Sequence, residues 1–352
     1  MPDKDATHTL PVHGAAQLPR VVVDSYNLEI EDNKGFVGDK ASKSAFTRML
    51  DDIRKTLRKT GDDPFGDAPS ESIGKKKLDA ALREGDPDTA AVVQGAVEGF
   101  AQELAAVIKR YVRLKSWRKT ERIVVGGGFS SSRIGALAVS RAEILLKGED
   151  VDVDLDMIKN DPDEAGLIGS VHLLPPWMLK GHDEMLTVDI GGTNIRCGVV
   201  TFNLHKAKDL SRASVTDMQL WRHAKEDSLK RDEAVAELCG MLKNLKKGRE
   251  GKLVPVIGIG CPGVIEADGS IDRGAQNLPG NWEAGSFNLP AEIREALPSI
   301  GEHETLVVMH NDAVVQGLSE LPRMTEAKHW GVLTIGTGLG NARYTNRKLE
   351  RD

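Results

Sequence analysis

The sequence of 352 residues has few cysteines, no positive net charge and no long hydrophobic run. Its three cysteines, Cys197, Cys239 and Cys261, are odd in number and far apart, which favours reduced thiols over a disulfide framework. No cysteine or histidine cluster has the spacing of zinc ligands. We therefore expect no structural metal and no zinc.

The charge balance argues against nucleic acids and membranes as partners. The formal net charge is -6 and the isoelectric point is about 5.9, so no overall positive field would hold a nucleic acid or an anionic membrane surface. No stretch approaches the ~20 apolar residues of a spanning helix, and the N-terminal MPDKDATHTLPVHG lacks the apolar core of a secretion signal. We expect a cytoplasmic protein.

Strand-like and helix-like segments alternate along the chain. Helical spacing or helix-like sequence occurs at residues 44–59, 88–111, 132–147, 162–174 and 231–246. Runs typical of strands occur at 122–125, 186–190, 195–202, 254–259, 305–309 and 330–335. The alternation predicts an α/β fold, and the hydrophobic content of 40% is enough for two modest lobes or one large unit.

An acidic residue and a glycine turn come together in VDIGGTN, residues 188–194. Without side chains, the two glycines would let backbone N–H groups approach a phosphate closely, and Asp189 could then orient hydrated Mg²⁺. An ordinary hairpin turn explains two glycines equally well. The candidate phosphate-binding residues here are Asp189, Gly191, Gly192, Thr193 and Asn194.

A second glycine loop follows the strand-like run at 330–335. In TIGTGLG the hydroxyl of Thr337 and the backbone amides of the loop could donate to phosphate oxygens. Two such loops, each after a strand and each carrying a threonine, indicate a polyphosphate held between two lobes. The candidates in this loop are Gly336, Thr337, Gly338 and Gly340.

Asn311 and Asp312 follow the strand expected at 305–309. Such a pair could grip one substrate hydroxyl while the carboxylate removes the proton of another. The same residues could form a turn, or Asp312 could cap the helix that follows. Both roles remain open from the sequence.

Five segments together resemble the ROK family of bacterial sugar kinases, which belongs to the actin-like and hexokinase-like ATPase superfamily. They are LTVDIGGTNIRCGVV, IGIGCPGVIEADGSI, NLPGNW, VVMHNDAVVQGLSEL and LTIGTGLGNA, in family order across residues 186–341. The resemblance implies a two-lobed ribonuclease H-like fold, ATP and Mg²⁺ as cofactors, and the two phosphate loops described above. It also implies Asp312 as catalytic base, Asn277 and Asn311 as ligands of sugar hydroxyls, and Gly263 in a loop that closes over the substrate.

The family normally continues well past its second phosphate loop. Here the segments similar to that continuation lie at the front of the chain: the helix through Ala96 and Leu104, then ERIVVGGGFSSS, then DPDEAGLIGSVHLL. The resemblance therefore implies a circular permutation, with new ends after the second phosphate loop. It assigns Gly126, Gly127 and Gly128 to the adenosine loop.

The permuted order predicts how the chain divides. We expect a mobile arm over residues 1–20, a large adenosine-side lobe over 21–160 and 313–352, a helix and linker over 161–184, and a small lobe over 185–312. The family's Glu-x-Gly-His sugar motif and its cysteine-rich zinc motif are absent, and NLPGNW has one residue more than usual between Asn277 and Trp282. The identity of the sugar therefore stays open.

The resemblance implies transfer of the ATP γ-phosphoryl group to a hydroxyl of a hexose, an amino sugar or a related polyol. A sugar-responsive transcription regulator and a silent sugar sensor are the alternatives, because some relatives carry a DNA-binding helix-turn-helix. Interspersed acidic residues over 41–117 and the negative net charge argue against the regulator. We expect a small-molecule sugar or polyol as partner, neither nucleic acid nor membrane, and the sequence allows a homodimer without fixing the oligomeric state.

Overall fold

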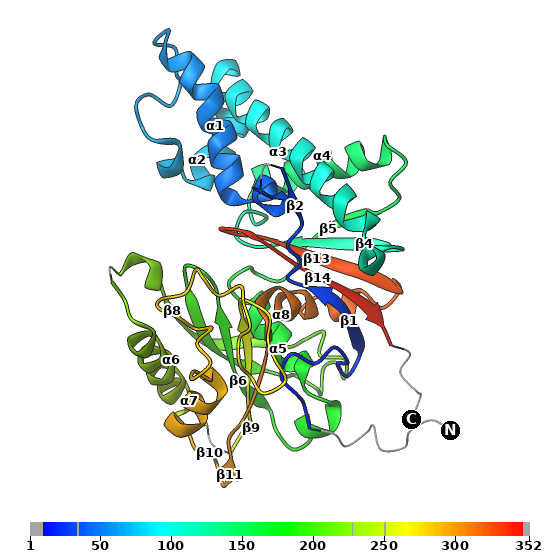
Figure 1. Ribbon diagram of the computed structural model, residues 1–352, viewed down its shortest axis with the longest axis vertical. Helices are drawn as coiled ribbons and strands as arrows, with labels where there is room; N and C mark the ends of the chain where they lie inside the picture. Colours follow the sequence, from blue (N-terminus) through cyan, green and yellow to red (C-terminus); the bar gives the residue numbers. More distant parts are fainter. Residues whose placement is uncertain (1–9, 34, 227, 250, 348–352) are drawn as a thin grey trace. The chain divides into compact units, whose positions relative to one another are not determined.

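The computed structural model describes residues 10–33, 35–226, 228–249 and 251–347 (Figure 1). Contacts divide the chain into two compact units. The first contains residues 10–27, 163–328 and 342–347, and the second contains 28–162 and 329–341. The expected large lobe of 21–160 and 313–352 corresponds mainly to the second unit, but 21–27, 313–328 and 342–347 lie in the first unit. Residues 1–9 of the expected arm lie outside the described residues.

The first unit is built on a five-stranded sheet with strand order β12-β9-β6-β7-β8. Strands β6 (Glu184–Ile190), β7 (Ile195–Thr201) and β8 (Ser214–Trp221) run antiparallel, which confirms the hairpin predicted around residues 191–194. Strands β9 (Leu253–Cys261) and β12 (Leu306–Asn311) lie parallel to β6. A small hairpin of β10 (Ser299–Ile300) and β11 (His303–Glu304) precedes β12.

Helices cover both faces of this sheet. Helices α6 (Arg231–Lys246) and α7 (Leu289–Ala296) pack on one face around Leu186, Val188 and Ile190. Helices α5 (Ala165–Ser170) and α8 (Asp312–Leu318) pack against each other, and α5 approaches the sheet closely where glycines leave room. A Cβ at Gly198 would lie 2.7 Å from Leu167, so the glycine is required for this approach.

The first and the last described strands of the chain form a pair in the first unit. Strand β1 (Val21–Tyr26) runs antiparallel to β14 (Leu339–Asn346), with Val21 opposite Asn346. Arg343 is buried in this pair and bonded to Asp24. Residues 10–20 of the arm expected to be mobile are held by hydrogen bonds such as Gly14 N–H to Met309 O at 2.9 Å.

The second unit contains three parallel strands, with β4 (Arg122–Gly126) between β5 (Asp154–Met157) and β13 (His329–Ile335). Its helices are α1 (Lys43–Arg58), α2 (Lys75–Glu84), α3 (Pro87–Arg113) and α4 (Arg133–Lys147), and β2 (Glu31–Asp32) pairs with β3 (Gly35–Phe36). The sequence patterns made no prediction for the residues of helix α2. The two units together confirm the predicted α/β class.

Short 3-10 turns join several of these elements. They are η2 (Val37–Ala41), η3 (Ser70–Ser72), η4 (Lys115–Trp117), η5 (Val171–Leu173), η6 (Pro176–Leu179), η7 (His223–Lys225) and η8 (Leu321–Arg323). The helix predicted at 162–174 is therefore α5 followed by η5.

Helix α3 is the one described helix that is long and apolar enough to cross a membrane, although no such stretch is expected from the sequence. Of the apolar window of this helix, 56% is buried inside the protein. Phe100, Leu104 and Ile108 are fully buried in the core of the second unit. This burial accounts for the apolar character of α3.

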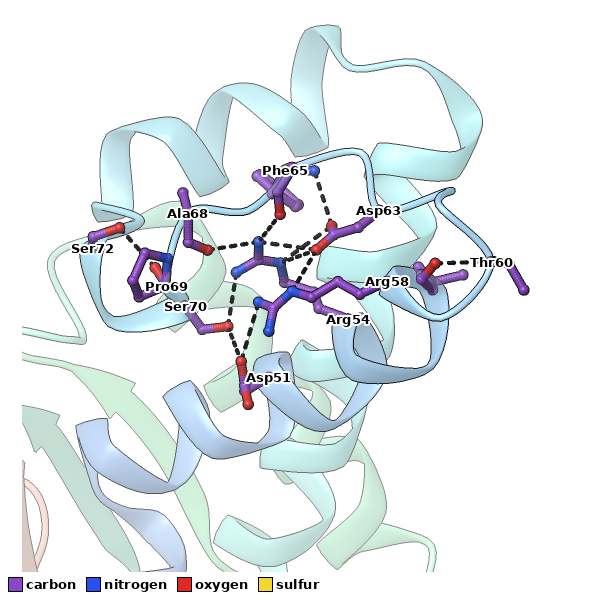
Figure 2. Close-up of polar contacts among 12 residues, drawn as sticks. Asp51, Arg54, Arg58, Thr60, Asp63, Phe65, Ala68, Pro69, Ser70 and Ser72 are labelled. Atoms are coloured by element: carbon purple, nitrogen blue, oxygen red, sulfur yellow. Dashed lines mark hydrogen bonds and ion pairs between the residues drawn. The ribbon is translucent and has the colours of Figure 1, made fainter.

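A buried arginine organises the loop between α1 and α2 (Figure 2). The guanidinium of Arg54 is inaccessible to solvent, donates to both carboxylate oxygens of Asp63 at 3.0 and 3.2 Å, and donates to Ser70 Oγ at 2.8 Å. It also donates to the carbonyls of Gly66 and Ala68. These bonds satisfy backbone groups of an otherwise irregular loop and fix the position at which α2 begins.

Candidate active site

The carboxyl ends of three parallel strands gather the predicted site residues of the first unit. Asp189 on β6 lies opposite Gly260 on β9, and Gly260 lies opposite His310 on β12. The residues just beyond these positions lead into the glycine turn, into Gly263, and into Asn311 and Asp312. Ligand sites of open α/β sheets form at this edge.

Asp189 is 7% exposed and faces α5. One oxygen accepts a bond from Arg196 Nη1 at 3.2 Å, and a Cβ at Gly166 would collide with the other oxygen. Burial raises the pKa of Asp189, although the charge of Arg196 opposes that effect. Arg196 is also bonded to Asp163, so a second carboxylate shares its charge.

Asp312 is the first residue of α8 and is partly buried at the edge of the site. Burial and, second, the negative charge of Asp189 raise the pKa of Asp312 to about 7, while backbone N–H groups at the start of α8 act in the opposite direction. A carboxyl group with this pKa exchanges a proton readily near neutral pH. That property suits a general base.

The helix cap anticipated for Asp312 belongs to its neighbour. The side-chain oxygen of Asn311 accepts bonds from the N–H groups of Ala313 and Val314 at 3.0 and 3.3 Å, and its Nδ2 donates to Gly263 O at 3.0 Å. Asn311 is 1% exposed. Its amide thus fixes the start of α8 and the loop at Gly263, and a sugar hydroxyl would have to compete with these bonds.

The glycine turn between β6 and β7 is held from two sides. His223, which is buried, makes a hydrogen bond through Nε2 to Gly191 O at 2.9 Å, and Ala224 N–H donates to Thr193 O. A Cβ at Gly192 would lie 3.2 Å from Cβ of Asn277, so the predicted sugar ligand Asn277 lies against the turn. The first unit therefore brings together Asp189, the turn at 191–194, Gly263, Asn277, Asn311 and Asp312.

The two other predicted nucleotide loops meet in the second unit. Gly126 pairs with Thr334 at the ends of β4 and β13, and a Cβ at Gly127 would collide with the backbone of Ile335. The turn at Gly336–Gly338 is closed by the bond from Gly336 N–H to Gly338 O at 2.9 Å, and Gly340 lies within β14. Gly127 has φ +88, a conformation that favours glycine.

Helix α2 brings two charged residues to the Gly126–Gly128 loop. Lys75 Nζ donates to Gly128 O and to Ser131 Oγ. The carboxylate of Asp79 accepts the N–H groups of Arg133 and Ile134 at 3.1 and 3.0 Å, at the N-terminus of α4. An acidic group stabilises this end of a helix.

Several of these residues could not be singled out from sequence. Lys75, Asp79 and His223 are distant in sequence from the loops they contact and belong to no motif. Arg196 carried a usable signal, because in a hairpin closed by residues 191–194 it must lie opposite Asp189.

The first unit could hold Mg²⁺ through a carboxylate together with water and phosphate oxygens. No group of three His, Cys, Asp or Glu side chains capable of holding a metal occurs among the described residues. Mg²⁺ commonly keeps several waters and binds one or two carboxylates together with substrate phosphates. Asp189 could supply such a carboxylate, with phosphate and water supplying the other oxygens.

Comparisons with known proteins give similarities over part of the chain. No family model matches. A glucokinase of Thermotoga maritima is 28% identical over 169 residues, which is 47% of this chain and 46% of the relative. The chain thus spans about half the length of the curated relative it matches. A Listeria monocytogenes protein described as a candidate N-acetylmannosamine kinase is 23% identical, with a TM-score of 0.35 over 48% of this chain and 50% of that one.

Proposed function

We propose that this protein is an ATP-dependent kinase that phosphorylates a hydroxyl of a hexose, an amino sugar or a related polyol in the cytoplasm. The observation that carries the proposal is Asp312, a carboxyl group with a pKa raised to about 7 at the carboxyl edge of β12. Asp189, Asn277 and Gly263 gather at the same edge. The partial similarity to a glucokinase supports the same class of reaction.

In the proposed reaction Asp312 accepts the proton of the acceptor hydroxyl as its oxygen attacks the γ-phosphorus of ATP. The new oxygen–phosphorus bond forms as the bond to the β-phosphate oxygen breaks, and ADP leaves. Most of the catalysis in such transfers comes from positioning and from neutralising charge. Bound Mg²⁺ would neutralise phosphate charge, and Asp189 would orient its water ligands.

The glycine loops of the second unit are the proposed nucleotide site. Gly126–Gly128 and Gly336–Gly340 lie at the ends of adjacent strands, so both can present backbone N–H groups to one nucleotide. The Gly191–Asn194 turn, which belongs to the first unit, is also proposed to bind phosphate. The side chain of Thr337 would donate its hydroxyl to a phosphate oxygen.

A coupled assay of ADP release with Mg-ATP and a panel of hexoses, amino sugars and cyclitols tests the function. We expect acceptor-dependent turnover that falls about 10² to 10⁴-fold in Asp312→Asn, the contribution typical of a positioned base. Asp232→Asn is the matched control, because the Asp232 side chain is 85% exposed. Full turnover in Asp312→Asn would refute the base, and ATP binding without turnover on any acceptor would favour a sensor.

Strand pairing supports the proposed circular permutation. In the first unit the strands follow one another along the chain as β6, β7, β8, β9 and β12. The pairs β6–β7 and β7–β8 are antiparallel, and the pairs β6–β9 and β9–β12 are parallel. If Asn346 were joined to Val21, the order β13, β14, β1, β4, β5 would contain the corresponding antiparallel pair β14–β1 and the parallel pairs β13–β4 and β4–β5.

The permutation can be reversed experimentally. Because Val21 lies opposite Asn346, a short linker can join residues 347 and 20, and new ends can be opened at Gly181–His182. We expect the re-permuted chain to fold with the same circular dichroism spectrum and to retain the kinase activity. A chain that forms only aggregates, beside a wild type prepared in parallel, would count against the proposal.

A further inference from the structure

A hairpin leads away from Gly263 in the first unit. Residues 264–273 form it through bonds from Val264 N–H to Arg273 O at 2.8 Å and from Asp272 N–H to Val264 O at 2.9 Å, with a bridge between Ile265 and Ile271. The hairpin directly follows Gly263, whose carbonyl accepts a hydrogen bond from the Asn311 side-chain amide. Its position therefore sets the position of one wall of the candidate acceptor site.

The beginning of the chain contacts this hairpin at three places. The hydroxyl of Tyr26 lies 3.3 Å from both the carbonyl and the amide nitrogen of Ile265, so it can donate to one and accept from the other. A Cβ at Gly14 would collide with the Ile265 carbonyl, and a Cβ at Gly269 would lie 3.2 Å from the His13 ring. The chain passes across the hairpin close enough to exclude a side chain at Gly14, and it lies close to Gly269.

The same segment covers the free edge of β12 just before the candidate base. Met309 N–H donates to His13 Nδ1 at 3.1 Å, and Gly14 N–H donates to Met309 O. His310 Nε2 lies 3.2 Å from Ala15 O, and its Nδ1 accepts from Asn311 N–H at 2.7 Å. These bonds require the neutral tautomer of His310 protonated at Nε2, the form that burial also favours by lowering its pKa to about 4.

Tyr26 contacts both the 264–273 hairpin and strand β12. Its ring packs edge to face against His310, with centroids 5.0 Å apart, while its hydroxyl reaches Ile265. One side chain thus touches the hairpin and the residue that precedes Asn311 and Asp312. None of the motifs that point to catalysis includes residues of this segment.

We propose that residues 13–27 form a brace that fixes the 264–273 hairpin against the end of β12, with Tyr26 as a positioning residue for acceptor binding. The acceptor part of this inference rests on the proposed function. The described hydrogen bonds of the Tyr26 hydroxyl go to Ile265 of the hairpin, and none of them reaches the glycine loops proposed for the phosphoryl donor. Loss of the Tyr26 hydroxyl therefore weakens acceptor binding and leaves ATP binding and the chemical step unchanged.

Amide hydrogen exchange tests the brace without a measurement of enzymatic activity. The Ile265 N–H donates to Tyr26 Oη, so we expect Tyr26→Phe to speed exchange in the 264–273 hairpin by about fivefold, the effect of one typical hydrogen bond. Tyr111→Phe is the matched control, because it removes a hydroxyl that donates to Leu28 O in the second unit. Unchanged exchange in Tyr26→Phe, or an equal increase in Tyr111→Phe, overturns the brace.

Steady-state kinetics test the positioning role. In Tyr26→Phe we expect KM for the acceptor to rise about fivefold, with kcat and KM for ATP within about twofold of wild type. A fall in kcat with an unchanged acceptor KM overturns the positioning role. If wild type phosphorylates no acceptor, the proposed function and the acceptor role both fail, and hydrogen exchange still decides whether the brace exists.

Discussion

The negative charge of Asp189 at the end of β6 raises the pKa of Asp312 at the start of α8. Asp189 lies on β6 and Asp312 directly follows β12, the two strands that flank β9, and burial acts on the pKa of both carboxyl groups in the same direction. Among the described contacts Arg196 is bonded to Asp189 but not to Asp312. The positive charge of Arg196 therefore compensates the negative charge of Asp189 more directly than that of Asp312. Acids held in such unequal environments can take separate roles in one reaction.

This coupling predicts a pH profile that a variant can shift. A base must be deprotonated, so kcat should rise about tenfold per pH unit below pH 7 and level off above it. In Asp189→Asn the like charge is gone, so the pKa of Asp312 falls and the midpoint of the residual activity moves to lower pH. Profiles of kcat against pH for both proteins measure the change, and a midpoint that moved upward or stayed in place would exclude the coupling.

Asp312 should reduce stability at alkaline pH. Its pKa is raised from 3.8 to about 7, so between these values the unfolded chain loses this proton first and stability falls as pH rises. Above about pH 7 the loss of stability is constant, at roughly 1.4 kcal/mol for each pH unit that separates the folded and unfolded pKa values. We therefore expect Asp312→Asn to melt at a higher temperature than wild type at pH 8 and at nearly the same temperature near pH 4. Thermal melts at the two pH values, with Asp232→Asn as control, provide the measurement.

Arg54 and Arg58 offer a matched comparison of a buried and an exposed cation on the same acid. Both contact Asp63, but the Arg54 side chain is 0% exposed and that of Arg58 is 31% exposed. Arg54→Met would leave Asp63 and two loop carbonyls short of donors, so we expect a loss of about 3–5 kcal/mol in the free energy of unfolding. Arg58→Met should cost at most about 1 kcal/mol.

Urea unfolding of the two variants separates these cases. Because the loop bound by Arg54 leads directly into α2, Arg54→Met should also loosen the contact of Lys75 with Gly128 and the contacts of Asp79 with the N-terminus of α4. Equal effects of the two substitutions would mean that burial does not distinguish them.

The sequence predicted those features that local patterns determine. Helical spacing or helix-like sequence located α1, α3, α4 and α6, and runs typical of strands located β4, β6, β7, β9, β12 and β13. They did not locate β8, in which half of the residues are polar and none is buried, or α2, which follows a turn-rich stretch and has exposed residues at both ends. Such elements depend on neighbours that are distant in sequence.

The candidate site shows the same division. Parallel strand ends brought Asp189, Gly263 and Asp312 together as their motifs indicated. The cap at α8 belongs to Asn311 because its side chain precedes the first helical residue and reaches two N–H groups. The roles of His223, Tyr26 and Lys75 depend on tertiary contacts that no local pattern encodes.

Lys75 and Lys76 are neighbours at the start of α2 and provide the last test. Lys75 bridges Gly128 and Ser131, and Lys76 makes no described contact with that loop. Because Lys75 holds the loop and adds positive charge beside the proposed nucleotide site, Lys75→Ala should weaken ATP binding several-fold. Titration calorimetry with Mg-ATP measures the affinity, and Lys76→Ala should bind as wild type does. Equal weakening in both variants would indicate a general electrostatic effect of α2, and no change in either would place the nucleotide away from the Gly126–Gly128 loop.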